Sequence, residues 1–163
     1  MAAVGLRQAG SRDGDVAALV AVYNAFNGPH WNVPWDLESD PETWHGVKTN
    51  DDGRVVELKL EDENMTGPIP TALLQLDILQ SLTITGRIGF IYYEYLAQGR
   101  LTGSIPEELC QLKNLHTLTI ADNGLTGSIP TELGLMEKLE SLTIRGKCLT
   151  GSIPKELGGM EKL

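Results

Sequence analysis

The chain has 163 residues, of which 41% are apolar and 21% charged, and its formal net charge is −9. That length suits a single domain with a buried core. So acidic a balance argues against binding to nucleic acid or to an anionic membrane surface. No stretch contains the roughly 18 consecutive apolar residues that a membrane span needs, and residues 1–15 lack the apolar segment of a signal peptide. With only two cysteines, a disulfide scaffold is excluded as well.

The N-terminal third predicts a helix followed by a hairpin. We expect residues 1–14 to be disordered and Asp15 to cap a helix over residues 16–26. Three tryptophans follow, and the turn at residues 51–53 closes a hairpin. His30 and His45 lie beside tryptophans in the sequence, where a packing role is expected.

A repeated hexapeptide determines the architecture of the remainder. The sequence MTGPIP or LTGSIP occurs at residues 65–70, 101–106, 125–130 and 149–154. The spacings are 36, 24 and 24 residues, so one repeat carries a twelve-residue insertion at about 87–99. Four copies of such a block indicate a solenoid.

Each unit combines two periodicities. The alternation in residues 118–120 predicts a short strand whose leucine and isoleucine face the core. The spacing by three of Leu109, Leu112 and Leu115 predicts 3₁₀ turns on the back of the coil. The glycine of every Thr-Gly pair is expected at a turn or in the left-handed region, and the proline after each isoleucine should begin the back segment.

The unit resembles the plant-type leucine-rich repeat (LRR), LxxLxxLxLxxNxLxGxIPxx, over about residues 54–163. The resemblance implies an α/β repeat fold: a right-handed solenoid of four repeats, the last truncated, with a parallel concave sheet and a helical N-terminal cap over residues 15–53. Plant receptors flank the cap's Trp-x-Gly-Val segment with paired cysteines. Here those cysteines are missing, so the cap resembles the cysteine-free caps of algal and microbial relatives. Asparagine fills its repeat slot only at Asn123, with Glu63 and Lys147 elsewhere, and we expect a looser coil.

The resemblance implies a module that binds a protein or peptide on its concave face and acts in recognition or signalling. The outward strand positions are Glu57, Lys59, Glu61, Ser81, Thr83, Thr85, Thr117, Thr119, Asp122, Ser141, Thr143 and Arg145. The alternative for each serine or threonine taken singly is that it is simply a residue suited to an exposed strand and contacts no partner. A minor alternative is that the regular threonines of this face bind ice or a glycan.

The insertion and one sequon supply further candidate contacts. Phe90, Tyr92, Tyr93 and Tyr95 would grip a partner as an aromatic loop. The alternative is a loop with no partner, or a retained intron. Asn64 begins a glycosylation sequon that matters only if the protein is secreted.

No spacing of Ser, His, Asp or Cys indicates catalysis, so we expect neither an enzyme nor a cofactor or metal. Cys110 should be a small residue, either buried or half-buried, and no bridge to Cys148 is expected. Without a signal peptide the chain reads as cytoplasmic. The alternative is a fragment of a receptor-like kinase or LRR-GTPase, at the cell surface or secreted in the receptor case. An uncapped C-terminal end predicts self-association.

Overall fold

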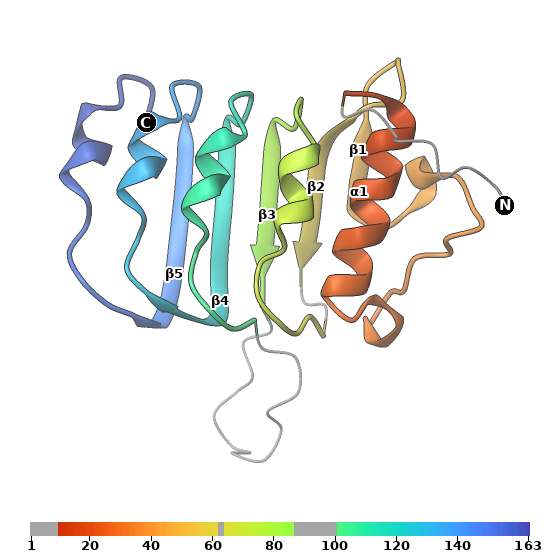
Figure 1. The fold of residues 1–163 in the computed structure, drawn as a ribbon, viewed down its shortest axis with the longest axis horizontal. Coiled ribbons are helices and arrows are strands. Elements are labelled where there is room, and N and C mark those ends of the chain that lie inside the picture. The colour runs from red at the N-terminus through yellow and green to blue at the C-terminus, as the bar shows by residue number, and fades with distance from the viewer. Residues whose placement is uncertain (1–9, 62–63, 87–100) are drawn as a thin grey trace, which may run out of the picture.

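The computed structural model describes residues 10–61, 64–86 and 101–163, which form one sheet backed by a layer of short helices (Figure 1). The sheet has the order β1-β2-β3-β4-β5. Only β1 is antiparallel to its neighbour; β2 to β5 run parallel in chain order. The strands are β1 Val47–Thr49, β2 Val55–Glu61, β3 Ser81–Thr85, β4 Thr117–Gly127 and β5 Ser141–Leu149. This arrangement is consistent with an LRR solenoid and confirms the predicted parallel sheet.

The 3₁₀ turns predicted for the back of each repeat are present. They are η3 Thr71–Gln75, η4 Glu107–Gln111, η5 Thr131–Leu135 and η6 Lys155–Gly159. A proline is the N-cap residue of each one, as expected from its fixed φ. The core lies between the two layers, where equivalent leucines such as Leu58, Leu82 and Leu118 are paired in register and 0% exposed.

The glycines of the repeated hexapeptide adopt the left-handed backbone that the sequence predicts. Gly67, Gly103, Gly127 and Gly151 have φ between 78° and 90°, a region that only glycine visits freely. Next to them the chain forms a second line of backbone hydrogen bonds from one repeat to the next. For example, the Thr126 amide donates to the Gly103 carbonyl at 2.7 Å. Each turn of the coil is therefore tied to the previous one at the sheet and again at this corner.

Helix α1 (Arg12–Ala25) begins earlier than the sequence suggested. Its N-cap is Ser11, whose hydroxyl accepts a hydrogen bond from the Gly14 amide at 3.1 Å. The prediction that Asp15 caps the helix is wrong, and the predicted disorder of residues 1–14 is wrong for residues 12–14, which belong to the helix. Asp15 lies inside the first turn and is fully buried because its carboxylate pairs with Arg54.

An aromatic cluster joins α1 to the segment that leads to the sheet. Tyr23, Trp31, Trp35 and Trp44 are each at most 5% exposed, and their ring centroids lie 5.0–5.4 Å apart in edge-on and stacked pairs. The short helices η1 (Gly28–His30) and η2 (Pro41–Thr43) carry the chain around this cluster.

The packing role expected for His30 and His45 is wrong, because both side chains are exposed. What His45 contributes to the core is its backbone. Its carbonyl accepts a hydrogen bond from the Trp35 indole nitrogen at 2.9 Å.

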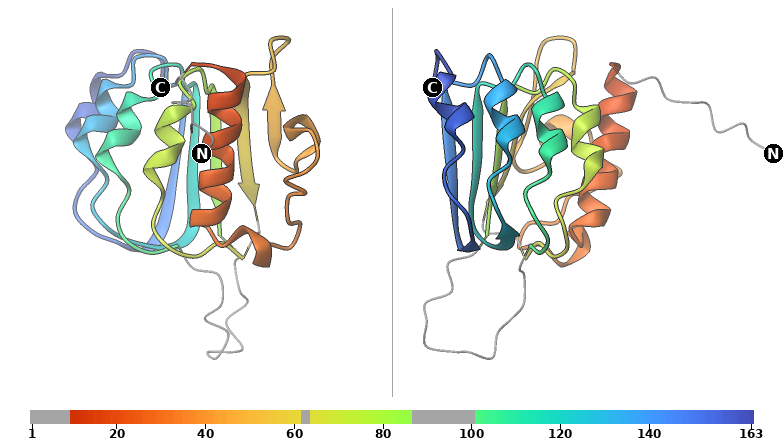
Figure 2. Two further views of the ribbon diagram at one scale, coloured as in Figure 1. Left: turned by 45° about the vertical axis from the view of Figure 1, so that its right-hand side comes forward. Right: turned by 60° about the vertical axis from the view of Figure 1, so that its left-hand side comes forward.

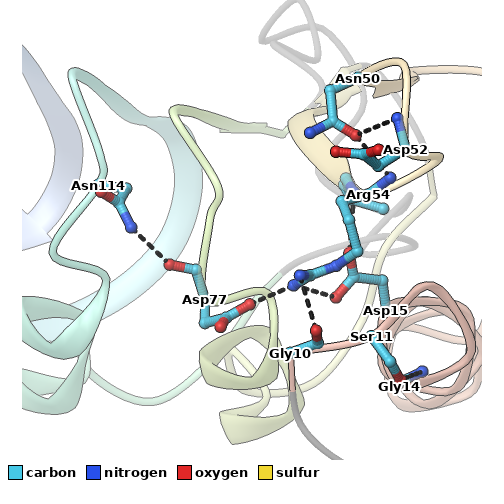
Figure 3. A network of polar contacts seen from close by, with 10 residues as sticks. Gly10, Ser11, Gly14, Asp15, Asn50, Asp52, Arg54, Asp77 and Asn114 are labelled. Atoms are coloured by element: carbon cyan, nitrogen blue, oxygen red, sulfur yellow. Dashed lines mark hydrogen bonds and ion pairs between the residues drawn. The ribbon is translucent and has the colours of Figure 1, made fainter.

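The buried Asp15 carboxylate holds α1 against the start of the sheet (Figure 3). It accepts hydrogen bonds from Arg54 Nε at 2.8 Å and from the Val55 amide at 2.9 Å. Arg54 also donates to the Gly10 carbonyl at 2.8 Å and pairs with Asp77, which follows η3. The hydrogen bond to Asp15 raises the pKa of Arg54, which keeps the guanidinium charged.

The same line of polar contacts continues along the back of the next repeats. The Asn114 side-chain amide donates to the Asp77 carbonyl at 2.9 Å, and Lys138 Nζ donates to Asn114 Oδ1 at 2.7 Å. One chain of hydrogen bonds thus links α1, β2 and three successive back segments. This chain of hydrogen bonds stabilises the N-terminal end of the stack, which covers the first repeat.

Replacing Asp15 with Asn should destabilise the fold by about 3 kcal/mol, because one partner of a buried charged pair is removed while Arg54 remains only 15% exposed. The measurement is the free energy of unfolding in urea. The matched control is Asp40→Asn, which breaks an arginine–carboxylate pair with Arg12 on the surface, 3.0 Å long, and should shift the midpoint little. Equal losses for the two variants would contradict a special role for the buried pair.

Candidate binding face

The face of the sheet that points away from the 3₁₀ layer brings the predicted contact residues together in register. We call the outward-facing residues of β2 to β5 on this side the open face. Three rows cross it from strand to strand. They are Glu57–Ser81–Thr117–Ser141, Lys59–Thr83–Thr119–Thr143, and Glu61–Thr85–Ala121. Neighbouring members of a row lie about 4.8 Å apart, the spacing of strands in a sheet.

Hydroxyl groups dominate the centre of the open face. The serines and threonines that β3 and β4 contribute to the three rows are half-buried, and Ser141 on β5 is exposed. None of these positions carries a large apolar side chain. A hydroxyl both donates and accepts hydrogen bonds, so this region suits the polar groups of an extended chain better than an apolar anchor.

Two residues of the predicted set, Asp122 and Arg145, do not fall in a row, because the register between β4 and β5 shifts after Ile120. The register places Ala121 opposite Thr85, and Ala121 is only 3% exposed. Asp122 is the next residue along β4, one position beyond the row. The sequence contained a signal for this, because Ala121 stands where Arg145 stands 24 residues later.

Charged residues gather at the N-terminal end of the open face. Lys59 pairs with Glu61 at 2.8 Å, and Lys48 on β1 pairs with Glu57 at 2.9 Å. The hydrogen bond that the Lys59 ammonium donates to Glu61 raises the pKa of Lys59, and the nearby charge of Glu57 raises it further. Lys59 therefore stays protonated through the neutral range, and its ion pair is lost only as the pH rises through this raised pKa.

The remaining candidates lie elsewhere or outside the described residues. Phe90, Tyr92, Tyr93 and Tyr95, with the insertion that carries them, fall outside the described residues. Asn64 is half-buried, and its amide nitrogen, which would carry a glycan, donates to the His30 carbonyl and to Asn32 Oδ1, both at 3.2 Å. Cys110 is half-buried as expected and Cys148 is exposed; both are free thiols.

No catalytic centre emerges from the described residues. Within them, no group of three or more His, Cys, Asp or Glu side chains is placed to hold a metal ion. A shallow hollow of about 560 Å³ lies on the back, between the segments that lead into η4 and η5. Its lining combines isoleucine, proline, serine and threonine residues of the two repeated hexapeptides and the helix starts with Glu107, Glu108 and Glu132.

The known proteins to which this chain is similar contain leucine-rich repeats. The family model "Leucine Rich Repeat" matches residues 114–136. The leucine-rich repeat receptor-like serine/threonine-protein kinase RGI4 of Arabidopsis thaliana is 39% identical over 88 residues, 54% of this chain and 7% of that kinase. The Arabidopsis HAESA ectodomain, solved with a peptide hormone ligand, has a TM-score of 0.78 and 27% identity over 94% of this chain and 24% of its own.

The Arabidopsis BIR2 ectodomain is similar over more of its own length. It has a TM-score of 0.75 and 27% identity over 91% of this chain and 76% of its own. These likenesses support a plant-type LRR protein. The chain spans only 7–15% of the length of its curated relatives, all of them receptor-like kinases by name. These matches therefore give no reason to assign the catalytic activity of a kinase to this chain.

The ion pair of Lys59 with Glu61 at the charged end of the open face can be tested directly. Glu61→Gln should lower the pKa of Lys59 toward its ordinary value, because it removes the charged acceptor with the largest effect on it. Glu57→Gln is the matched control and should lower the pKa less, since Glu57 acts only through its charge. Titration of the Lys59 Cε signal by NMR measures both. Equal effects of the two changes would contradict the hydrogen-bonded pair.

Proposed function

We propose that the chain is a recognition module that binds a protein or peptide ligand on the open face, acting in signalling. The observation that carries the proposal is the register that aligns serines and threonines across β3, β4 and β5. A partner lying across these strands meets a new hydroxyl about every 4.8 Å. The extended surface of a repeat protein is suited to such a partner.

The similar proteins support a ligand of this kind. By its title, the HAESA ectodomain binds a peptide hormone, and its fold is similar to nearly the whole of this chain. For this chain we propose the same class of ligand, a peptide or an exposed protein segment. Its polar groups would pair with the hydroxyls, and its charged groups would meet Lys59 and Glu61 at one end and Arg145 at the other.

We further propose the finer features of the architecture that the sequence predicts. The chain would be an LxGxIP-type repeat with right-handed coiling and a concave open face, in which residues 15–53 act as a cysteine-free N-terminal cap. Burial of the aromatic cluster and the closure of the sheet by β1 support the cap.

The same likeness supports a proposal for the place of the chain in the cell. Its curated relatives are receptor-like kinases, so we propose that it is the recognition part of a larger receptor-like protein at the cell surface. A cytoplasmic binder and an LRR-GTPase fragment are the alternatives. Among the described residues, no helix has the length and apolarity to cross a bilayer.

Ice or glycan binding is a weaker alternative. The three aligned threonines, Thr83, Thr119 and Thr143, are half-buried. The same row begins with the charged residue Lys59, so the threonines do not form a uniform hydroxyl surface. The open face of β2 to β5 also shows no aromatic side chain on which a sugar ring would stack. Both features favour a peptide.

The proposal predicts that peptides selected from a random displayed library against the whole chain will need the open face. Thr119→Arg and Thr143→Arg together should weaken the selected peptides by about 100-fold, because two bulky charges block adjacent positions of one row. Isothermal titration calorimetry with one synthetic selected peptide measures the loss.

The control places the same charge on the back of the coil. Gln111→Arg and Leu135→Arg change exposed residues at equivalent ends of η4 and η5, and should leave the affinity unchanged. Peptides that bind the open-face variant as well as the unaltered chain, or that are lost with the back variant, would overturn the proposal. Thermal unfolding of both variants establishes that each is folded.

A further inference from the structure

One position on the back of the coil carries a smaller side chain in each of three successive repeats. The four 3₁₀ turns η3 to η6 lie side by side along the back (Figure 2). The fourth residue of the turn is Leu74 in η3, Cys110 in η4 and Gly134 in η5. We call these three residues the back slot. Leu74 and Cys110 are half-buried and pack against the core, so the slot belongs to the packed part of the back layer.

The contacts of Gly134 show what the back slot faces. A Cβ atom added there would lie 2.6 Å from the Cβ of Glu156 and 3.0 Å from the carbonyl carbon and oxygen of the same residue. Glu156 belongs to η6, the next turn along the back. Carbon atoms in ordinary contact are about 3.5–4.0 Å apart, so η6 can approach this closely only because the slot holds no side chain. The φ of Gly134 is not positive, so the close approach of η6, and not the backbone conformation, requires glycine here.

The packing of the back layer follows the size of the slot residue. Neighbouring turns pack least extensively between η3 and η4, where the slot holds Leu74. They pack more extensively between η4 and η5, where it holds Cys110, and most extensively between η5 and η6, where it holds Gly134. A larger slot residue therefore goes with a looser contact between turns, as expected of a spacer.

The other sides of each repeat keep a constant width. Strands β2 to β5 are paired in parallel with equivalent residues in register, which fixes their spacing at about 4.8 Å. At the corner after the sheet, one amide of each repeat donates to a glycine carbonyl of the previous repeat. These hydrogen bonds are Thr102 to Gly67 at 2.9 Å, Thr126 to Gly103 at 2.7 Å and Thr150 to Gly127 at 2.8 Å. When only the back changes width, each repeat is tilted relative to the one before it.

From this geometry we infer that the back slot sets the curvature of the open face, and that Cys110 is a positioning residue for the ligand proposed above. A back that is wider than the sheet bends the sheet toward the open face, which brings the side-chain ends of neighbouring strands closer together. The residue at the slot thereby sets the spacing of the hydroxyl groups in each row without touching them. The part of the inference that concerns the ligand rests on the proposed function.

Distances between spin labels test the effect on the back. In the full chain with Cys148→Ser, labels attached at Gln75→Cys and Leu135→Cys lie on the exposed last residues of η3 and η5, the turns on either side of η4. Cys110→Gly, Cys110→Ala and Cys110→Leu should increase the distance measured by double electron–electron resonance in that order. The step from Gly to Ala should be about 1 Å, the shift that would bring the 2.6 Å separation at Gly134 to an ordinary contact.

A second pair of labels distinguishes bending from a general expansion. Ser81→Cys and Ser141→Cys place labels in one row of the open face, on β3 and β5. Their distance should not lengthen as the residue at position 110 grows, because the strands stay paired. The matched control varies Gln111, the exposed neighbour of the slot: in the Cys110→Ala background, Gln111→Gly and Gln111→Leu should change neither distance. A back distance that does not depend on the residue at position 110, or an increase of both distances together, would overturn the inference.

Ligand binding tests whether this curvature matters for recognition. A synthetic peptide selected against the unaltered chain should bind Cys110→Leu and Cys110→Gly about tenfold more weakly, and Gln111→Leu with unchanged affinity. Peptides selected against Cys110→Leu should instead prefer that variant, a preference that a merely destabilised fold would not produce. Thermal unfolding establishes that each variant is folded.

The two experiments keep the failure of this inference distinct from the failure of the proposed function. If peptides that need the open face bind all the Cys110 variants equally, the positioning role of Cys110 is wrong and the proposed function stands. If the selected peptides do not need the open face, the proposed function is wrong, and the label distances alone decide whether the slot sets the curvature.

Discussion

The inward leucines and isoleucines of each repeat are shielded from water only when a neighbouring repeat covers them. Leu58, Leu82 and Leu118 reach 0% exposure because the strands stack in a single register. That burial stabilises the fold by roughly 1.5–3 kcal/mol for each fully buried side chain. No repeat can gain this alone, so the stability of the stack depends on how its two ends are closed.

The N-terminal end is closed with a different chemistry from the interior. The chain adds β1 to the sheet and α1 to the helical layer, where a buried ion pair joins the buried apolar side chains of α1, such as Leu19 and Val22. Asp15 is fully buried but accepts hydrogen bonds from both Arg54 and the Val55 amide, so its burial leaves no charge unpaired. The pair and the hydrogen bond from the Val55 amide fasten the first turn of α1 to the start of β2.

Much of this was predictable from the sequence because repetition supplies its own register. The strands, the 3₁₀ turns, the left-handed glycines and the rows of Thr83, Thr119 and Thr143 all follow from one 24-residue period. The wrong predictions concern the N-terminal segment, which lies outside the 24-residue repeats. Asp15 resembles an N-cap because its role depends on Arg54, 39 residues away, and Ser11 precedes an Asp-Gly pair that favours turns over helices.

The open face is a consequence of the same constraint. Because alternate residues of each strand must enter the core, the intervening ones are aligned across the sheet whatever their identity. Selection for stability therefore fixes the geometry of this face while leaving its chemistry free to vary. In this chain the centre carries small hydroxyl residues and the charges stand at its ends, with Lys59 and Glu61 on β2 and Arg145 on β5. Such a surface discriminates between partners by the spacing of their polar groups, since it provides no deep pocket or apolar anchor to dominate the binding energy.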